Sequence, residues 1–122
     1  MNLLAESKQY IIFNEYETVM LKIKESQKMI QIGDFYGNPQ MAIISDDEKF
    51  CVMCGCGIII YYLREEFEEY QYHKKTSQWV EWGRSTANGD IWVENVKCLN
   101  DQQIEILTED GKILKLNIYK DF

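Results

Sequence analysis

The chain has one histidine, one proline and no surplus of basic side chains among its 122 residues. Its 13 Lys and Arg face 20 Asp and Glu, which gives a formal net charge of −7. A nucleic-acid backbone is bound by concentrated Lys and Arg, so we expect no nucleic-acid partner. A basic protein partner stays compatible, because opposite charge steers association.

Long apolar runs are also missing. The longest uninterrupted one, Ile58 to Leu63, is far below the ~18 residues of a membrane-spanning helix. The segment from Met1 to Lys8 lacks the basic and apolar regions of a signal peptide, and no lipidation motif is visible. We therefore expect no membrane association, a cytoplasmic location and reduced cysteines.

Catalytic constellations are absent as well. His73 is the one candidate for a His-centred triad, and neither a nucleophile elbow nor a phosphate-binding glycine loop is present. Many carboxylates could act as acid and base, but the sequence does not indicate which pair would share a cleft. We interpret the chain as a non-enzyme without a cofactor.

One cysteine motif needs separate treatment. Cys51 and Cys54 have the C-x-x-C spacing of a zinc site, yet zinc needs four ligands and no second pair follows. Cys56, Cys98 and His73 could complete the set, although none has a characteristic spacing. On a strand Cys51 and Cys54 would face opposite sides. We expect small buried apolar side chains and no metal, with the glycines around Cys56 forming a tight bend.

The pattern that is present has a period of two. Residues 104–108 and 112–116 alternate on either side of Glu109–Gly111, which predicts a hairpin with Gly111 in the left-handed conformation. The matching partners place apolar opposite apolar and acid opposite base. The predicted pairs are Ile104–Leu116, Ile106–Leu114, Leu107–Ile113 and Glu105–Lys115.

Further strands follow from the same reasoning. Residues 18–24 and 29–33 predict a hairpin with Ile23 opposite Ile30 and Leu21 opposite Ile32. Segments 41–45, 50–54 and 58–63 are apolar on both faces and are expected in the centre of a sheet. The remaining candidate strands are 10–13 and the two segments around the turn dipeptide Asn88-Gly89, namely 78–83 and 91–98.

No linker, repeat or low-complexity tract divides the chain, so we predict a single domain over residues 1–122. We expect a mostly β fold of about ten short antiparallel strands, a sandwich or partly open barrel, with at most one or two short helices. Residues 2–9 are expected to form a short helix. Residues 64–72 are compatible with either a helix or an edge strand. The pattern indicates no oligomeric state.

Acidic and aromatic residues alternate after the apolar segment 58–63. Binding surfaces favour Tyr and Trp with charge at their rim, which makes this stretch a candidate partner-binding site. The competing interpretation is ordinary solubility for the acids and a structural core position for each tryptophan. The candidate residues are Glu65, Glu66, Glu68, Glu69, Tyr70, Tyr72 and Trp79.

A family resemblance covers about residues 33–63. Its elements are Gly33 to Pro39, Ala42 to Ser45, Phe50 to Val52 and Gly57 to Tyr61. Together they resemble small acidic bacterial immunity proteins of polymorphic or contact-dependent toxin systems. The resemblance implies stoichiometric neutralisation of a cognate toxin domain, often a nuclease, whose surface is expected to be basic. The alternatives are a small β-barrel or sandwich that binds an apolar small molecule, and an accessory subunit of a larger complex.

Overall fold

The computed structural model describes residues 1–122 and contains eleven strands and no helix. The prediction of a mostly β, antiparallel fold is thereby confirmed. No helix has the length and apolar character needed to cross a bilayer. The strands are β1 (Asn2–Glu6), β2 (Tyr10–Glu15), β3 (Thr18–Ile23), β4 (Met29–Asp34), β5 (Met41–Ile44), β6 (Phe50–Gly55), β7 (Gly57–Tyr62), β8 (Trp79–Trp82), β9 (Val93–Cys98), β10 (Gln103–Thr108) and β11 (Ile113–Asn117).

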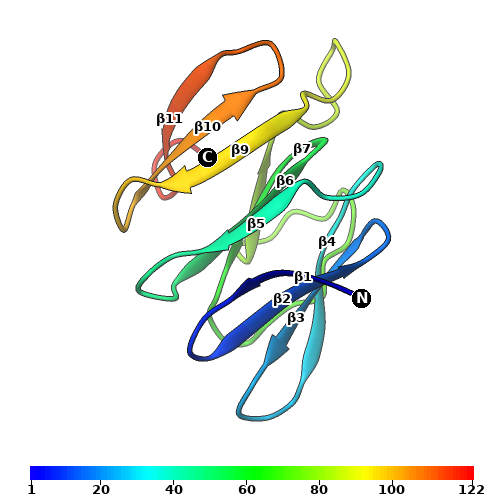
Figure 1. The fold of residues 1–122 in the computed structure, drawn as a ribbon, viewed down its shortest axis with the longest axis vertical. Helices are drawn as coiled ribbons and strands as arrows, with labels where there is room; N and C mark the ends of the chain where they lie inside the picture. Colours follow the sequence, from blue (N-terminus) through cyan, green and yellow to red (C-terminus); the bar gives the residue numbers. More distant parts are fainter.

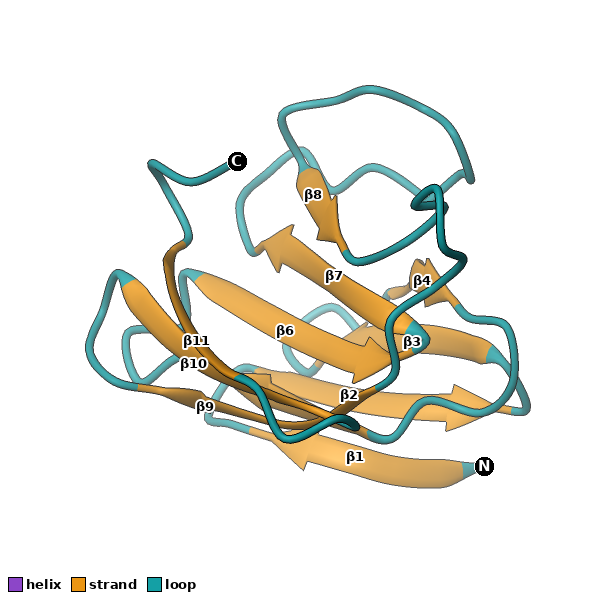
Figure 2. Ribbon diagram, turned by 90° about the horizontal axis from the view of Figure 1, so that it is seen from above, coloured by secondary structure: helices purple, strands orange, loops and turns teal.

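The strands form three antiparallel sheets, and none of them closes into a barrel. The first sheet has the order β1-β2-β3-β4, the second β5-β6-β7-β8 and the third β11-β10-β9. Figure 1 shows the second sheet between the other two, and Figure 2 shows the same arrangement from above. The fold is therefore a sandwich with a third layer.

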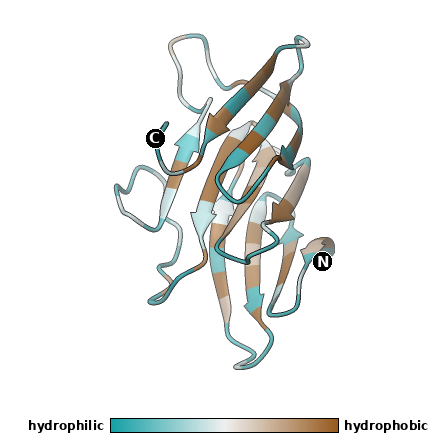
Figure 3. Ribbon diagram, turned by 90° about the vertical axis from the view of Figure 1, so that its left-hand side faces the viewer, coloured by the Kyte–Doolittle hydropathy of each residue, from teal (hydrophilic) through white to brown (hydrophobic).

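The middle sheet is buried on both faces, and every residue of β6 and β7 is buried. Figure 3 shows brown, apolar segments along the strands, whereas most of the connecting loops are teal or pale. Side chains facing the first sheet include Ala42, Cys51, Met53, Ile59 and Tyr61. Side chains facing the third sheet include Val52, Cys54, Ile58 and Ile60. Two-sided apolarity in the sequence thus reports coverage by two neighbouring layers.

The central placement of segments 50–54 and 58–63 is confirmed, whereas that of segment 41–45 is wrong. β5 is an edge strand of the middle sheet. It is nevertheless apolar on both faces, because Ala42 packs into the first core while Met41 and Ile43 pack against the second. An edge strand that is covered by a layer on each face is therefore apolar on both faces, as a central strand of the same sheet is.

The register of the C-terminal hairpin is confirmed pair by pair between β10 and β11, and Gly111 has φ 85°. The register between β3 and β4 is wrong by two residues. Leu21 pairs with Ile30 instead of Ile32, because the hairpin closes where Ile23 N donates to Lys28 O at 2.9 Å. A two-residue slip leaves the same side chains facing the core, so the apolar pattern could not discriminate between the registers.

Three local predictions need correction. Residues 2–9 contain strand β1 instead of a helix, because β2 supplies backbone partners that a helix of two turns could hardly replace. Residues 64–72 form neither a helix nor a strand. The turn at Asn88-Gly89 is present, with Thr86 bridged to Gly89, but β8 and β9 on its two sides belong to different sheets.

Candidate functional site

Six of the seven candidate residues lie in the loop from Leu63 to Gln78, which connects β7 to β8. The loop follows the free edge of β4. The Tyr70 amide donates to Gln31 O at 2.8 Å, and the Gln31 amide donates to Glu69 Oε2 at 2.9 Å. Gln78, at its far end, donates to Tyr62 O at 2.6 Å. These bonds hold an irregular segment in one path and cover part of an exposed strand edge.

Tyr70 and Trp79 lie inside the core and are 4% and 3% exposed. Their ring centroids are 5.1 Å apart, and Tyr61 stacks on Trp79 at 6.2 Å. The Tyr70 hydroxyl donates to Glu81 Oε1 at 2.8 Å, and burial together with this contact raises the pKa of Tyr70. Their rings are therefore out of reach of a partner. They anchor the loop, so we leave them out of the contact surface.

The structure divides the four glutamates into two pairs. Glu68 accepts a hydrogen bond from the Thr76 hydroxyl, and Glu69 is bound to the edge of β4. Both carboxylates therefore hold the loop together. Glu65 and Glu66 are exposed, and no hydrogen bond or ion pair engages their side chains. These two remain available to a partner.

Tyr72 is the third available residue, but it faces different neighbours. Its ring is 55% exposed, and its hydroxyl shares a hydrogen bond with Ser85 at 2.7 Å, in the loop that follows β8. The neighbouring His73 has φ 65° and its ring lies 3.9 Å from that of Tyr72. The contact residues predicted from the sequence are thus separated by the path of the loop.

Glu65 and Glu66 border a surface depression of about 590 Å³. The turn between β3 and β4 forms its other side. The turn contributes Glu25 and Lys28, so the depression has three carboxylates, with those of Glu65 and Glu66, and a single ammonium group. The lining residues are Ile23, Glu25, Ser26, Lys28, Glu65, Glu66 and Phe67. We call this the acidic depression. Its lining is mostly polar and negatively charged, with Ile23 and Phe67 as the two apolar members, which suits a basic side chain with an apolar stem.

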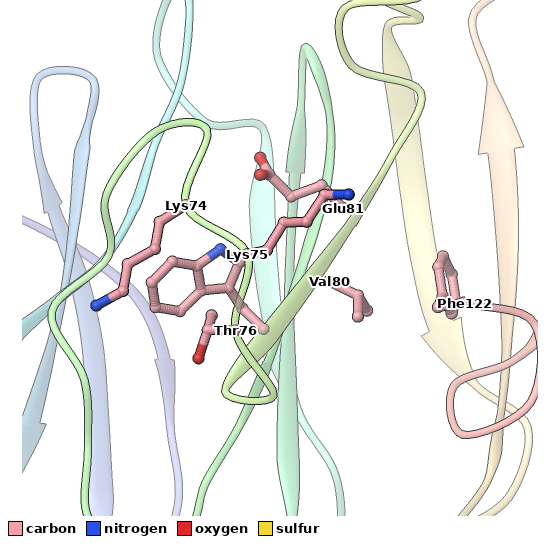
Figure 4. A pocket seen from close by; sticks show the side chains of 7 residues that line it. Lys74, Lys75, Thr76, Val80, Glu81 and Phe122 are labelled. Atoms are coloured by element: carbon pink, nitrogen blue, oxygen red, sulfur yellow. The ribbon is translucent and has the colours of Figure 1, made fainter.

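A second depression, of about 460 Å³, lies on the returning part of the same loop. Figure 4 shows that the ammonium groups of Lys74 and Lys75 point away from each other and that Phe122 lies on the far side. Binding of an anion would need convergent donors. We therefore assign no anion site to it.

Two of the four thiols lie in β6 of the middle sheet, and Cys98 ends β9 of the third sheet. Cys51 and Cys54 are buried on opposite faces, as predicted for a strand, and burial raises the pKa of Cys54 to about 12. Cys56 forms the tip of the bend between Gly55 and Gly57. No three His, Cys, Asp or Glu side chains lie close enough together to hold a metal ion. Apolar packing accounts for the two buried cysteines.

Sequence reasoning missed the contacts of Arg84, whose side chain is only 8% exposed. Its Nε lies 2.9 Å from Glu81 Oε1, and its two terminal nitrogens donate to Cys56 O at 3.1 Å and Asp34 O at 2.7 Å. The guanidinium also lies 4.7 Å from the centre of the Phe35 ring. One side chain therefore ties the middle sheet to the end of the first sheet. A single Arg among polar loop residues carries no pattern that predicts this.

A comparison of the chain with protein-family models, curated proteins and solved structures finds no match. The assignment of a function therefore depends on the chemistry of its surface.

Proposed function

We propose that this protein is an immunity-type inhibitor, which binds a basic toxin domain stoichiometrically in the cytoplasm and performs no catalysis. The observation that carries the proposal is the acidic depression, which is lined by Glu25, Glu65 and Glu66 and has Lys28 as its one basic residue. Exposed carboxylates accelerate encounter with a basic surface, and Ile23 and Phe67 add apolar contact area.

The loop that carries Glu65 and Glu66 supports this proposal through its rigidity. Tyr70 and Trp79 anchor it in the core, and Gln31 holds its middle on the edge of β4. Binding by a segment that is already ordered does not incur the entropy cost of ordering it. A rigid irregular loop on a sheet scaffold is a common way to present a binding surface.

A protein partner suits this architecture better than an apolar small molecule. Both interior faces of the middle sheet are occupied by fully buried side chains such as Phe50, Ile59 and Ile60. Five surface depressions of about 230 to 590 Å³, the two above among them, all open to solvent. A small-molecule site would bury most of its ligand in an apolar cavity.

The proposal is tested with the protein encoded beside this chain in its genome. Its C-terminal domain is produced in a bacterial host with and without this chain. We expect the domain alone to arrest growth, and co-production to restore growth through a one-to-one complex visible by light scattering. Absence of growth arrest, or arrest that this chain does not relieve, would refute the immunity role. Binding without any toxicity would instead support the accessory-subunit alternative.

The acidic depression is tested in the same complex with E65K/E66K. Both side chains are free of structural bonds, so we expect an intact fold and an association rate reduced roughly tenfold or more at low salt. The matched control is E94K/E109K, which makes the same charge change on exposed side chains of the third-sheet region. Equal rates for the two variants would remove the depression from the interface.

A further inference from the structure

The middle sheet has an open edge at β8. This strand pairs with β7 on one side only, whereas β5 at the opposite edge contacts β1 of the first sheet and β9 of the third. In Figure 2, β8 lies at the end of the middle sheet, and loops continue beyond it. Unpaired backbone groups along a strand edge can pair with a strand of another chain. The edge of β8 is therefore a candidate surface for a protein partner.

The register between β7 and β8 shows which backbone groups are unpaired. The Tyr62 amide donates to Gln78 O at 2.8 Å, so these two residues form a hydrogen-bonded pair. Pairs of this kind alternate along antiparallel strands, and Val80 is therefore bonded to β7 as well. Trp79 and Glu81 direct their amides and carbonyls away from β7. No loop residue and no side chain bonds to these four groups.

The unpaired stretch is short and lies beside the second depression. Gly83, the next residue in the same row, already accepts a hydrogen bond from the Ile91 amide at 2.8 Å. The depression of about 460 Å³ borders the remaining stretch, because residues 79–81 are among its lining residues. In Figure 4 the lysine-bearing loop lies on one side of the strand and Phe122 on the other. An added strand would run between these two borders.

The two faces of β8 differ in the neighbours that an added strand would meet. Trp79 and Glu81 face the first sheet, where the loop from Leu63 to Gln78 runs. Val80 faces the third sheet, on the side of Phe122. Side chains of a strand alternate between the two faces, so every second residue of an added strand meets the loop.

The loop side of this edge is positively charged. Lys74 and Lys75 are exposed, and neither has an ion pair. Their ammonium groups point apart, so they suit two carboxylates on alternate residues of a strand, ~7 Å from each other, better than one anion. Glu81 lies at the other end of this face and disfavours a carboxylate directly opposite it. The charges therefore favour carboxylates opposite Trp79 and Ser77.

We propose that the edge of β8 binds an extended, acidic segment of a protein partner as a fifth, antiparallel strand of the middle sheet. Its two carboxylates lie opposite Trp79 and Ser77, within reach of the lysines. The residue opposite Val80 is apolar and packs against Phe122, and the residue opposite Glu81 is neutral. Backbone hydrogen bonds supply the affinity, and the alternating side chains select the segment.

A second copy of this chain does not suit the same edge. A two-fold axis that joins two β8 strands keeps each face of the sheet on its own side. The lysines of both copies, Lys74 and Lys75, would then meet on one face and repel each other. The inference goes beyond the proposed function, because this surface is separate from the acidic depression and takes a segment of the opposite charge.

The probe is a peptide with the core Thr-Val-Glu-Val-Glu, capped at both ends and added to the full chain. Four backbone hydrogen bonds correspond to a dissociation constant on the order of 1 mM, which two ion pairs should lower roughly tenfold. Hydrogen exchange followed by NMR should show faster exchange at Trp79 and Glu81 than at Val80, and the peptide should slow both at least tenfold. Trp79 and Glu81 amides that are already as slow as Val80, or that the peptide leaves unprotected, would overturn the proposal.

N-methylation of the peptide tests the strand geometry without changing its charge. A methyl group on the amide of the first Glu removes the donor that faces Trp79 O and should weaken binding at least tenfold. The matched control carries the methyl group on the preceding Val, whose amide faces away from β8, and should bind within about twofold of the parent peptide. Equal weakening by both methyl groups would show that the peptide is not bound as a strand.

Two protein variants test the acidic character of the segment. K74S/K75S should weaken peptide binding roughly tenfold at low salt. The control K8S/K28S makes the same charge change on exposed lysines that also lack an ion pair, and it should alter binding by less than about twofold. Equal affinities for the two variants would refute the assignment of an acidic segment.

Light scattering of the free chain tests the choice of occupant. We expect a monomer, and a dimer that the peptide dissociates would replace the partner segment with a second copy. Failure of any of these tests leaves the proposed function intact, because Lys74 and Lys75 do not line the acidic depression. Conversely, peptide binding by a chain that fails to relieve toxicity would retain this surface and refute the immunity role.

Discussion

Arg84 lies outside both hydrophobic cores, yet its replacement with methionine should greatly reduce the stability of the protein. Arg84→Met keeps most of the apolar stem over Phe35 and removes the guanidinium. The carbonyls of Cys56 and Asp34 then lose their donor, and the Glu81 carboxylate loses its ion-pair partner. The remaining hydrogen bond from Tyr70 to Glu81 is not sufficient to neutralise that carboxylate.

The size of the effect follows from these contacts. A hydrogen bond to a charged group contributes about 1.5–3 kcal/mol, and opening a buried ion pair costs about 3–5 kcal/mol. The Glu81 side chain is 24% exposed and Asp34 lies at the surface, so water compensates for part of the loss. We expect a decrease of about 3 kcal/mol in the free energy of unfolding, or ~10 °C in Tm. Arg84→Lys should cost about half as much, because an ammonium cannot serve three separated acceptors at once.

Urea unfolding followed by tryptophan fluorescence measures both variants. A double-mutant cycle with Glu81→Gln isolates the ion pair, for which we expect a coupling of about 1–2 kcal/mol. The control is Arg64→Met, since the other arginine of the chain is exposed and lies over the Tyr62 ring. A loss below ~0.5 kcal/mol for Arg84→Met, or no coupling to Glu81, would contradict the account of this contact.

Two further predictions concern protonation and thiol access. The Ser7 hydroxyl, assisted by the backbone amide at Gln9, holds the pKa of Glu48 below its ordinary 4.5, so the bond stabilises the fold above pH 4.5 and is lost as the pH falls further. At pH 7 the Glu48→Gln variant should therefore have a lower urea midpoint of unfolding than the parent protein. The difference between the two midpoints should disappear at pH 3, and a difference that persists there would refute the linkage. At pH 8 a disulfide reagent, followed by its absorbance, should label the exposed Cys98 first. It should reach Cys51 and Cys54 only when the protein unfolds, so early labelling of either buried thiol would contradict their burial.

The sequence predicted the pairing of two strands correctly where the apolar pattern and the turn residues favoured the same register. The hairpin around Gly111 was predictable pair by pair, because only one register matched its charges, its apolar residues and its turn. The hairpin of β3 and β4 had no opposed charges to discriminate registers, and the actual turn, with Gln27 at φ 62°, has no glycine to mark it. The third layer was not predicted, although the two-sided apolarity of β6 and β7 is the pattern that coverage of both faces produces.

The candidate site was only partly predictable for a similar reason. Alternating acids and aromatics do not indicate which aromatic rings turn inward, and Tyr70 and Trp79 do so because the core next to Tyr61 accommodates them.

The burial of β6 and β7 on both faces has a consequence for the chain before it folds. Residues 50–63 form a strand-forming stretch without a charged residue, which is the composition that drives aggregation when exposed on a nascent chain. Acidic clusters flank it directly, at 46–48 and at 65–69, where charges act as gatekeepers against intermolecular pairing. Lysine at Glu65 and Glu66 would preserve that protection because it keeps a charge. Alanine there would leave the stretch less guarded, and we expect such a variant to be recovered in lower soluble yield.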